Sequence, residues 1–325
     1  MLVTYLITVY NKEKYLKNVI KSIKEIEGDF EKEYIFVNDG STDNSLEILK
    51  QETQGWENIK IISHDNCGPA KSTNVGIEIA KGDFVQFIDA DDILTKDSTS
   101  LSLEYLNKFS CDVVGSRRGT YDIHTLKTKG PAKPINLPNP ILITDPLYIL
   151  LVHRVSKKDD QFLKTKPRVT EIRGIGSTGS VVSLDLLKKI KGCDETLFVQ
   201  DYSLSLRCSL KTGFVYLHRP ICFSPTEYDG THVSQNKEVF LKCQSITAVY
   251  NLFKDNPQIA ERYYPLVYYS LRSCLWKINR ELKFLPKYLF AQYVKIFGHN
   301  FSRDELLSLY EHELDKLHKR LDAAA

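Results

Sequence analysis

The sequence lacks the features that are typical of secreted proteins, membrane-spanning proteins and proteins with Cys-x-x-Cys zinc sites. Its seven cysteines are scattered and include no Cys-x-x-Cys pair, which is typical of free thiols in a reducing compartment. No secretory signal opens the chain, and it holds no run of about 18 apolar residues. The net charge of +3 is too small to favour a nucleic-acid partner. We therefore expect a cytoplasmic globular protein that does not bind nucleic acid.

Common nucleotide-binding motifs are absent or poorly placed. No Gly-x-x-x-x-Gly-Lys-Ser/Thr loop is present, so the sequence offers no site for ATP hydrolysis. The run from Gly174 to Gly179 matches the Gly-x-Gly-x-x-Gly pattern, but charged Glu171 and Arg173 interrupt the stretch before it. A dinucleotide-binding fingerprint follows an apolar strand instead. These glycines fit better where the backbone must come close to a bound ligand.

Short apolar runs alternate with helix-period segments over the N-terminal third of the chain. The runs are residues 2–9, 34–37, 59–62 and 84–88. Between them, Asn11 is a predicted helix cap, Thr42 and Asp43 open a second helix, and Pro69 suits the first turn of a third. This alternation predicts an α/β fold with a mostly parallel, Rossmann-like sheet and flanking helices.

The segment from Asp89 to Asp92 carries the strongest chemical signal. It follows the fourth predicted strand, and ligands of parallel sheets bind at the carboxyl ends of strands. Carboxylates two residues apart on an extended chain can share Mg²⁺ or Mn²⁺, which binds one or two protein carboxylates beside phosphate oxygens and water. The alternative is that Asp89 and Asp92 only form turns and cap a helix.

Four segments of this region resemble the family-2 inverting glycosyltransferases, which have the GT-A fold. They are Thr8–Asn11, Val37–Asp43, Gly68–Gly76 and Lys81–Asp92, in the family's order and with similar gaps. A later stretch, Gly192–Glu195 followed by Gln200–Leu204, resembles the family's acceptor-side motif. The resemblance covers roughly residues 1–225. It implies transfer of a sugar from a nucleotide diphosphate sugar to an acceptor hydroxyl with inversion, in surface polysaccharide or glycoconjugate synthesis.

The resemblance also implies which residues contact the donor. They are Thr8, Tyr10, Asn11, Asp39, Lys71, Asn74, Asp89, Ala90 and Asp91. Tyr10 would stack on the base, a contact that contributes about 1–3 kcal/mol. Asp39 would accept a hydrogen bond from the ring N–H that uracil offers, so a UDP-sugar is the expected donor. Alternatively, Tyr10 is a core aromatic residue at a strand end, and Asp39 only forms a turn.

The resemblance also assigns roles in the reaction to four residues. Asp91 would hold Mn²⁺ or Mg²⁺, and Asp89 would face the donor's ribose or sugar beside the ion. His232 stands where some members place a histidine near the metal or diphosphate, although a lone histidine is more often structural. Asp201 would take the proton of the acceptor hydroxyl as general base. The alternative role of Asp201 is to cap its helix.

Two positions depart from the family pattern. Thr73 stands where the family commonly has an arginine that approaches the diphosphate, and Lys71, two residues earlier, does not share its helix face. Gln200 stands where a glutamate usually precedes the catalytic aspartate. These differences leave open a weak or inactive protein that binds nucleotide sugars or glycans. A sugar nucleotidyltransferase is a further alternative, but it would need a Gly-rich basic loop where Tyr10–Glu13 stands.

We expect three parts along the chain. Residues 1–234 form the GT-A catalytic domain, with a nucleotide-sugar half at 1–115 and an acceptor half at 116–234. Residues 235–322 form a helical C-terminal region, and residues 323–325 resemble a cloning remnant.

Between Glu261 and Phe297 the C-terminal region mixes lysine and arginine with aromatic residues. Such helices can lie on an anionic bilayer, which would bring the protein to the inner membrane surface and to a lipid-linked acceptor. The alternative is that they pack on the catalytic core or on a second copy in a homo-oligomer, since aromatic stripes at helical spacing usually mark a core. The acceptor, a glycan or a lipid-linked molecule, is not identified by the sequence.

Overall fold

The computed structural model describes residues 1–130, 140–143 and 178–227, together with part of residues 245–258. The chain divides into two compact units, one formed by residues 1–146 and 171–236 and the other by residues 147–170 and 237–325. In the second unit, helical residues that include Ala248 and Leu252 are buried. The predictions for His232 and for the basic and aromatic segment 261–297 fall outside the described residues.

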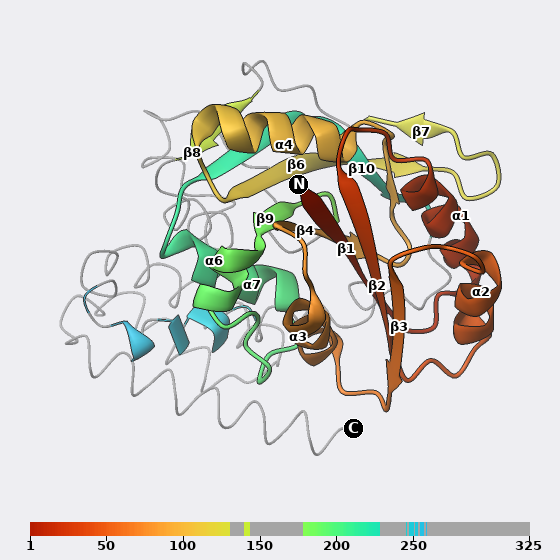
Figure 1. Cartoon of the computed structure of the whole chain (residues 1–325). Coiled ribbons are helices and arrows are strands. Elements are labelled where there is room, and N and C mark those ends of the chain that lie inside the picture. Colours follow the sequence, from red (N-terminus) through yellow and green to blue (C-terminus); the bar gives the residue numbers. More distant parts are fainter. Residues whose placement is uncertain are drawn as a thin grey trace, which may run out of the picture. The chain divides into compact units, whose positions relative to one another are not determined.

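A ten-stranded mixed sheet forms the centre of the first unit (Figure 1). Its strands are β1 (Leu2–Val9), β2 (Glu31–Asp39), β3 (Ile59–His64), β4 (Phe84–Asp89), β5 (Ile93–Leu94), β6 (Val113–Tyr121), β7 (Thr128–Lys129), β8 (Ile141–Ile143), β9 (Val181–Ser183) and β10 (Phe214–Pro225). The main path runs β3-β2-β1-β4-β9-β6-β10-β5. The first four strands pair in parallel, whereas β9 lies antiparallel between β4 and β6.

Helices cover both faces of the parallel strands. They are α1 (Glu13–Lys24), α2 (Ser45–Glu52), α3 (Pro69–Ile79), α4 (Ser98–Phe109), α6 (Leu184–Lys189) and α7 (Gln200–Ser209). Figure 1 shows α1 and α2 on one face of β1–β3 and α3 on the other.

Side chains along β1 point alternately to the two faces of the sheet, and this explains the two helix layers. Tyr5 and Ile7 enter a buried cluster with Leu16 of α1, whereas Leu6 points to the opposite face. There Gly76 of α3 lies so close that an added Cβ would fall 2.0 Å from Leu6 Cδ1. The glycine therefore lets α3 pack directly on the strand that leads to the candidate site.

The predicted fold class is confirmed, as are the four N-terminal strands and the helix that begins at Pro69. The prediction that Asn11 caps the first helix is wrong. Asn11 has a φ of 51°, and α1 begins only at Glu13. The pattern also did not predict α4 or β6. Burial alternates along most of β6, which pairs in parallel with β10 and antiparallel with β9. Among the described residues, no helix has both the length and the apolar character needed to cross a membrane.

Candidate active site

Several residues predicted to contact the donor lie together at the carboxyl ends of the parallel strands. Thr8 lies opposite Asp89 in the pairing of β1 with β4, and Val9 lies opposite Asn38 in the pairing of β1 with β2. Tyr10 follows β1 with 47% of its surface exposed. An exposed aromatic ring at this edge is free to take up a flat ligand, so the alternative role of Tyr10 as a core residue does not hold.

Side chains tie the loop after β1 to the loop after β2. Asn11 Oδ1 accepts a hydrogen bond from the backbone N–H of Thr42 at 2.8 Å. The backbone N–H of Glu13 donates to Asp43 Oδ2, and Glu13 Oε2 accepts from the backbone N–H of Asn44, both at 3.0 Å. Asn11, a predicted donor contact, therefore uses its side-chain oxygen to join the two loops.

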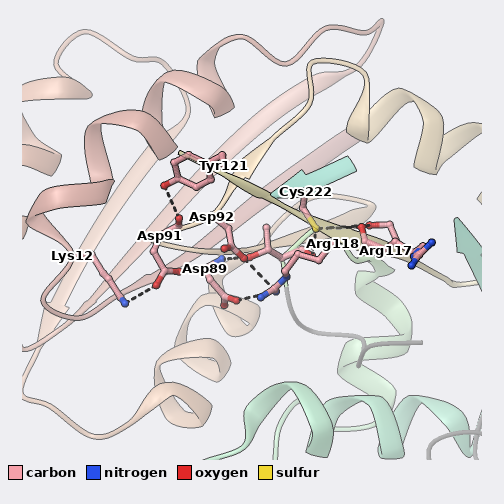
Figure 2. Close-up of polar contacts among 10 residues, drawn as sticks. Lys12, Asp89, Asp91, Asp92, Arg117, Arg118, Tyr121 and Cys222 are labelled. Carbon is pink, nitrogen blue, oxygen red and sulfur yellow. Dashed lines mark hydrogen bonds and ion pairs between the residues drawn. The ribbon is translucent and has the colours of Figure 1, made fainter. Parts of the chain in front are cut away.

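Figure 2 shows the acidic cluster at the end of β4. Lys12 Nζ lies 2.6 Å from Asp91 Oδ2. Arg118 Nη2 lies between two other carboxylates, 3.4 Å from Asp89 Oδ2 and 3.2 Å from Asp92 Oδ2. Two basic side chains from different elements thus hold three carboxylates that are neighbours in sequence, a gathering that repulsion between like charges would otherwise oppose.

Hydrogen bonds to the backbone fix this turn. Tyr121 Oη donates to the carbonyl oxygen of Asp91 at 2.9 Å. The backbone N–H of Asp89 donates to Thr178 Oγ1 at 2.6 Å, and the backbone N–H of Asp92 donates to the carbonyl oxygen of Asp89 at 2.9 Å. Because β6 and the segment before β9 supply these partners, the carboxylates are positioned by elements far from them in sequence.

The cluster shifts the pKa values of its members. Burial raises the pKa of Asp92 to about 7, although the charge of Arg118 opposes the shift. Burial also raises the pKa of Asp89, and the negative charges of Asp91 and Asp201 add to this increase while Arg118 opposes it. Asp92 is therefore partly protonated near neutral pH. A cation bound beside Asp89, whose side chain is more exposed, would oppose the rise in its pKa.

The donor set fits a hard divalent cation. Lys12 and Arg118 pair with Asp89, Asp91 and Asp92, and the charge of Asp201 also acts on Asp89. Four carboxylates beside two basic groups leave an excess of negative charge when all are ionised. The Asp89 side chain is 35% exposed and that of Asp91 is 7% exposed. Mg²⁺ and Mn²⁺ prefer such oxygen ligands. Asp89 and Asp91 are thus suited to bind an ion that also touches a ligand at the sheet edge.

Asp201 lies in the first turn of α7, on a separate element from the other carboxylates. Its Oδ1 accepts a hydrogen bond from the backbone N–H of Tyr202 at 2.7 Å. Val199 is the residue that precedes the helix, and its side chain makes no cap. One oxygen of Asp201 thus stabilises the start of the helix, although Asp201 is not the N-cap residue itself. The negative charge of Asp201 also raises the pKa of Asp89, so Asp201 is close enough to interact electrostatically with the acidic cluster.

Asn74, a predicted donor contact, makes hydrogen bonds to the loop that follows α6. Its Oδ1 accepts from the backbone N–H of Cys193 at 2.8 Å, and its Nδ2 donates to the Cys193 carbonyl oxygen at 3.1 Å and to Glu195 Oε1 at 2.9 Å. Both ends of the amide are therefore engaged. We infer that Asn74 positions the loop that leads into α7 and Asp201.

Replacing Asn74 by alanine should lower turnover more than donor affinity. The change removes the bonds that hold the Cys193 loop against α3, so Asp201 loses its fixed position relative to the donor. We expect kcat to fall about tenfold or more, as for other misplaced catalytic groups, with UDP affinity retained. Steady-state kinetics and calorimetry with UDP would measure the two effects. Glu78→Ala, an exposed change on the same helix, is the control, and a loss of UDP affinity equal to the loss of kcat would contradict the positioning role.

Two other residues predicted to contact the donor, Ala90 and Lys71, differ in solvent exposure. Ala90 is buried between the two metal-ligand candidates. Lys71 is exposed on α3, and its charge acts on the Cys67 thiol. Thr73 is 2% exposed and faces the interior. Lys71 therefore does not occupy the place of the arginine that family members commonly carry at the position of Thr73.

Asp39 is buried at the end of β2 and is held by the loop before α3. Its Oδ1 accepts from the backbone N–H of Cys67 at 2.7 Å, and its Oδ2 accepts from the backbone N–H of Gly68 at 3.1 Å. Asn66 Nδ2 also donates to Asp39 Oδ2 at 3.4 Å. Each carboxylate oxygen can accept two hydrogen bonds, so Oδ1 keeps acceptor capacity for a ligand.

Two basic residues of the site, Lys12 and Arg118, escaped the sequence reasoning. Burial disfavours the charge of Lys12, but the neighbouring Asp91 outweighs this and raises its pKa. Arg118 is largely buried in β6, and burial there is likewise outweighed by Asp92 and other acidic neighbours, which raise its pKa. The sequence gives little signal for Arg118, because its strand, VVGSRRGTY, is largely polar and was not predicted. Only its burial shows that it requires a carboxylate partner.

The fold and this acidic edge define a class, the proteins with the GT-A fold. The model of glycosyl transferase family 2 matches residues 4–174, which is more than half of the chain. The chain therefore belongs to glycosyltransferase family 2, and the predicted resemblance is confirmed.

Curated relatives share part of the chain. An uncharacterised glycosyltransferase of Haemophilus influenzae is 31% identical over 128 residues, 36% of this chain and 50% of that protein. The Staphylococcus aureus poly(ribitol-phosphate) beta-N-acetylglucosaminyltransferase TarS is 31% identical over 114 residues, 34% of this chain and 19% of that protein. The match thus spans half or less of the length of these relatives.

Solved structures agree on the fold. The S. aureus TarS 1–349 complex with UDP-GlcNAc superposes with a TM-score of 0.57 at 16% identity and covers 92% of both chains. The mannosyltransferase PcManGT from Pyrobaculum calidifontis, solved with GDP-Man and Mn²⁺, has a TM-score of 0.53 at 15% identity and covers 99% of this chain and 82% of that one.

Proposed function

We propose that this protein transfers a sugar from a UDP-sugar to an acceptor hydroxyl with inversion at the anomeric carbon. The observation that carries this proposal is that Asp89, Asp91 and Asp201 gather at the sheet edge of a family-2 chain. The relative TarS is named for N-acetylglucosamine transfer to poly(ribitol phosphate), which supports a role in surface polysaccharide or glycoconjugate synthesis.

In the proposed reaction Asp201 is the general base. Its carboxylate takes the proton of the acceptor hydroxyl while the hydroxyl oxygen attacks the anomeric carbon. The bond from this carbon to the diphosphate oxygen breaks on the opposite face of the sugar, so the configuration inverts. One oxygen of Asp201 accepts the Tyr202 N–H, which orients the carboxylate, and the other oxygen would receive the proton.

The edge of the sheet would hold the rest of the donor. Exposed Tyr10 would stack on the base, and the remaining acceptor capacity of Asp39 would receive the ring N–H of uracil. Asp91 and Asp89 would bind Mn²⁺ or Mg²⁺. When bound, this ion would neutralise charge on the departing diphosphate. Lys12, already paired with Asp91, adds a positive charge at the same place.

The base of the donor can be tested by thermal stability. In the presence of Mn²⁺, UDP should raise the melting temperature more than CDP or GDP at the same concentration, because tighter ligands stabilise the folded state more. Cytosine has no N–H at the ring position where uracil carries one. Guanine has a ring N–H, but in this larger purine it lies farther from the ribose than the uracil N–H does. Stabilisation by GDP or CDP without stabilisation by UDP would contradict the assignment of the donor.

A second candidate function is nucleotide-sugar or glycan binding without turnover. It is favoured by Thr73, whose buried side chain supplies no positive charge for the diphosphate. Donor hydrolysis and transfer assays with Mn²⁺ separate the two candidates. Turnover that depends on Asp201 supports the transferase, whereas UDP binding without turnover in any preparation supports the binding protein.

A further inference from the structure

A second group of side chains with potential metal ligands lies where β2 and β3 end and α3 begins, and it shares no residue with the acidic cluster. Asp39, His64 and Cys67 each offer one ligand atom, and these three atoms lie within 4.8 Å of one another. Pairing of β2 with β3, the edge strand in Figure 1, sets Asp39 opposite His64. The backbone N–H of Cys67 then donates to Asp39, which brings the thiol to the same place.

The distances match the edges of a coordination tetrahedron. His64 Nδ1 lies 3.6 Å from Asp39 Oδ1 and 3.5 Å from Cys67 Sγ. Typical zinc bonds of about 2.0–2.1 Å to nitrogen or oxygen and about 2.3 Å to sulfur give edges of about 3.3 Å and 3.6 Å at tetrahedral angles. Two of the three edges are therefore close to their final lengths before any ion binds.

The same geometry argues against a cysteine nucleophile. A nucleophilic relay needs the thiol at one imidazole nitrogen and the carboxylate at the other. Here both groups face Nδ1 of His64. The other nitrogen, Nε2, is buried and has no hydrogen-bond partner within the described part of the chain. Convergence of nitrogen, oxygen and sulfur on one point is the arrangement of a cation site.

We propose that Asp39, His64 and Cys67 bind a thiophilic divalent cation of the zinc class, distinct from the Mn²⁺ or Mg²⁺ proposed at Asp91. Thiolate and imidazole ligands select zinc over magnesium and manganese. Binding converts the Cys67 thiol to a thiolate, which bonds to the ion while its proton passes to solvent. Nδ1 of His64 also gives up its 2.8 Å contact with the Asp65 carbonyl oxygen, and water completes the coordination.

The site has a consequence for the donor that rests on the proposed function. Asp39 is the carboxylate proposed to receive the base N–H, so an ion on Asp39 withdraws the acceptor that the uracil needs. Zinc should therefore weaken UDP binding, through a site that does not overlap the acidic cluster.

Cobalt(II) is the probe, because a cobalt–thiolate bond has a charge-transfer absorption that a cobalt–carboxylate bond lacks. Reduced full-length protein should show this band on titration with Co²⁺, and Zn²⁺ should displace it. Cys67→Ser should abolish the band and weaken Zn²⁺ binding, measured by calorimetry, at least about tenfold. Cys67 is exposed, so this variant should keep its fold, which circular dichroism checks.

Two variants serve as controls. Cys111→Ser, at a partly buried thiol elsewhere, should keep the band, and so should Asp91→Asn, which lacks the proposed Mn²⁺ ligand. No band in the wild type, or an equal band in Cys67→Ser, would overturn the site. UDP affinity that zinc lowers in the wild type but not in Cys67→Ser would support the competition, and equal lowering in both would refute it. Because the cobalt titration needs neither donor nor acceptor, its outcome is independent of whether the protein transfers a sugar.

Discussion

Asp201→Asn should reduce kcat by about 10²–10⁴-fold, the usual contribution of a general base, while UDP binds as in the wild type. The amide keeps an oxygen that can accept the Tyr202 N–H, so the start of α7 should remain intact. It cannot take a proton from the acceptor hydroxyl. The loss should therefore appear in the chemical step, measured by single-turnover transfer with saturating donor.

Asp185→Asn is the matched control for this change. Asp185 also lies in the first turn of a short helix, but it is exposed and pairs with Lys189 on the surface. It should transfer sugar at the wild-type rate. If Asp201→Asn kept most of the wild-type kcat while donor hydrolysis still depended on Asp91, a different group would have to be the base.

Asp91→Asn should lower Mn²⁺ affinity at least about tenfold and transfer by about 10²–10³-fold, the typical effect of losing one electrostatic contact to the transition state. The amide is a weaker ligand for a hard cation, and it leaves Lys12 without its partner at 2.6 Å. Electron paramagnetic resonance of free Mn²⁺ measures the first effect without any turnover. The melting temperature, measured alongside, detects any damage caused by the unpaired lysine.

Lys12→Met provides the contrast. It removes the positive charge that competes with a cation for Asp91, so Mn²⁺ should bind more tightly to this variant than to the wild type. Opposite changes in Asp91→Asn and Lys12→Met would locate the ion at Asp91. Equal Mn²⁺ affinity in all three proteins would place the ion elsewhere.

Much of the fold of residues 1–115 could be predicted because its signals are local. The continuous apolar run of β1, Pro69 at the start of α3 and the acidic segment after β4 each specify their element within a few residues. The order of these elements then implies a parallel sheet, and the sheet brings their carboxyl ends together. Asp39, Asp89 and Asp91 were identifiable in this way.

Other parts of the site depend on contacts that no local pattern encodes. Asn11 was predicted as a helix cap but joins two loops, and Asn74, a predicted donor contact, also makes hydrogen bonds to the Cys193 loop. The partnership of Arg118 with Asp89 and Asp92 spans a large gap in sequence. A side-chain amide or guanidinium can serve many partners, so its sequence position alone does not identify which one it meets.

The sequence by itself determined the α/β fold, the family and the identity of the main acidic residues, since strand and helix periodicity and ordered motifs are written in neighbouring residues. Only the tertiary structure decided how their charges are balanced and which thiol meets which imidazole. Lys12, Arg118 and the Asp39–His64–Cys67 group come together through the pairing of separate strands, and electrostatic and metal-binding properties depend on distances of a few ångströms.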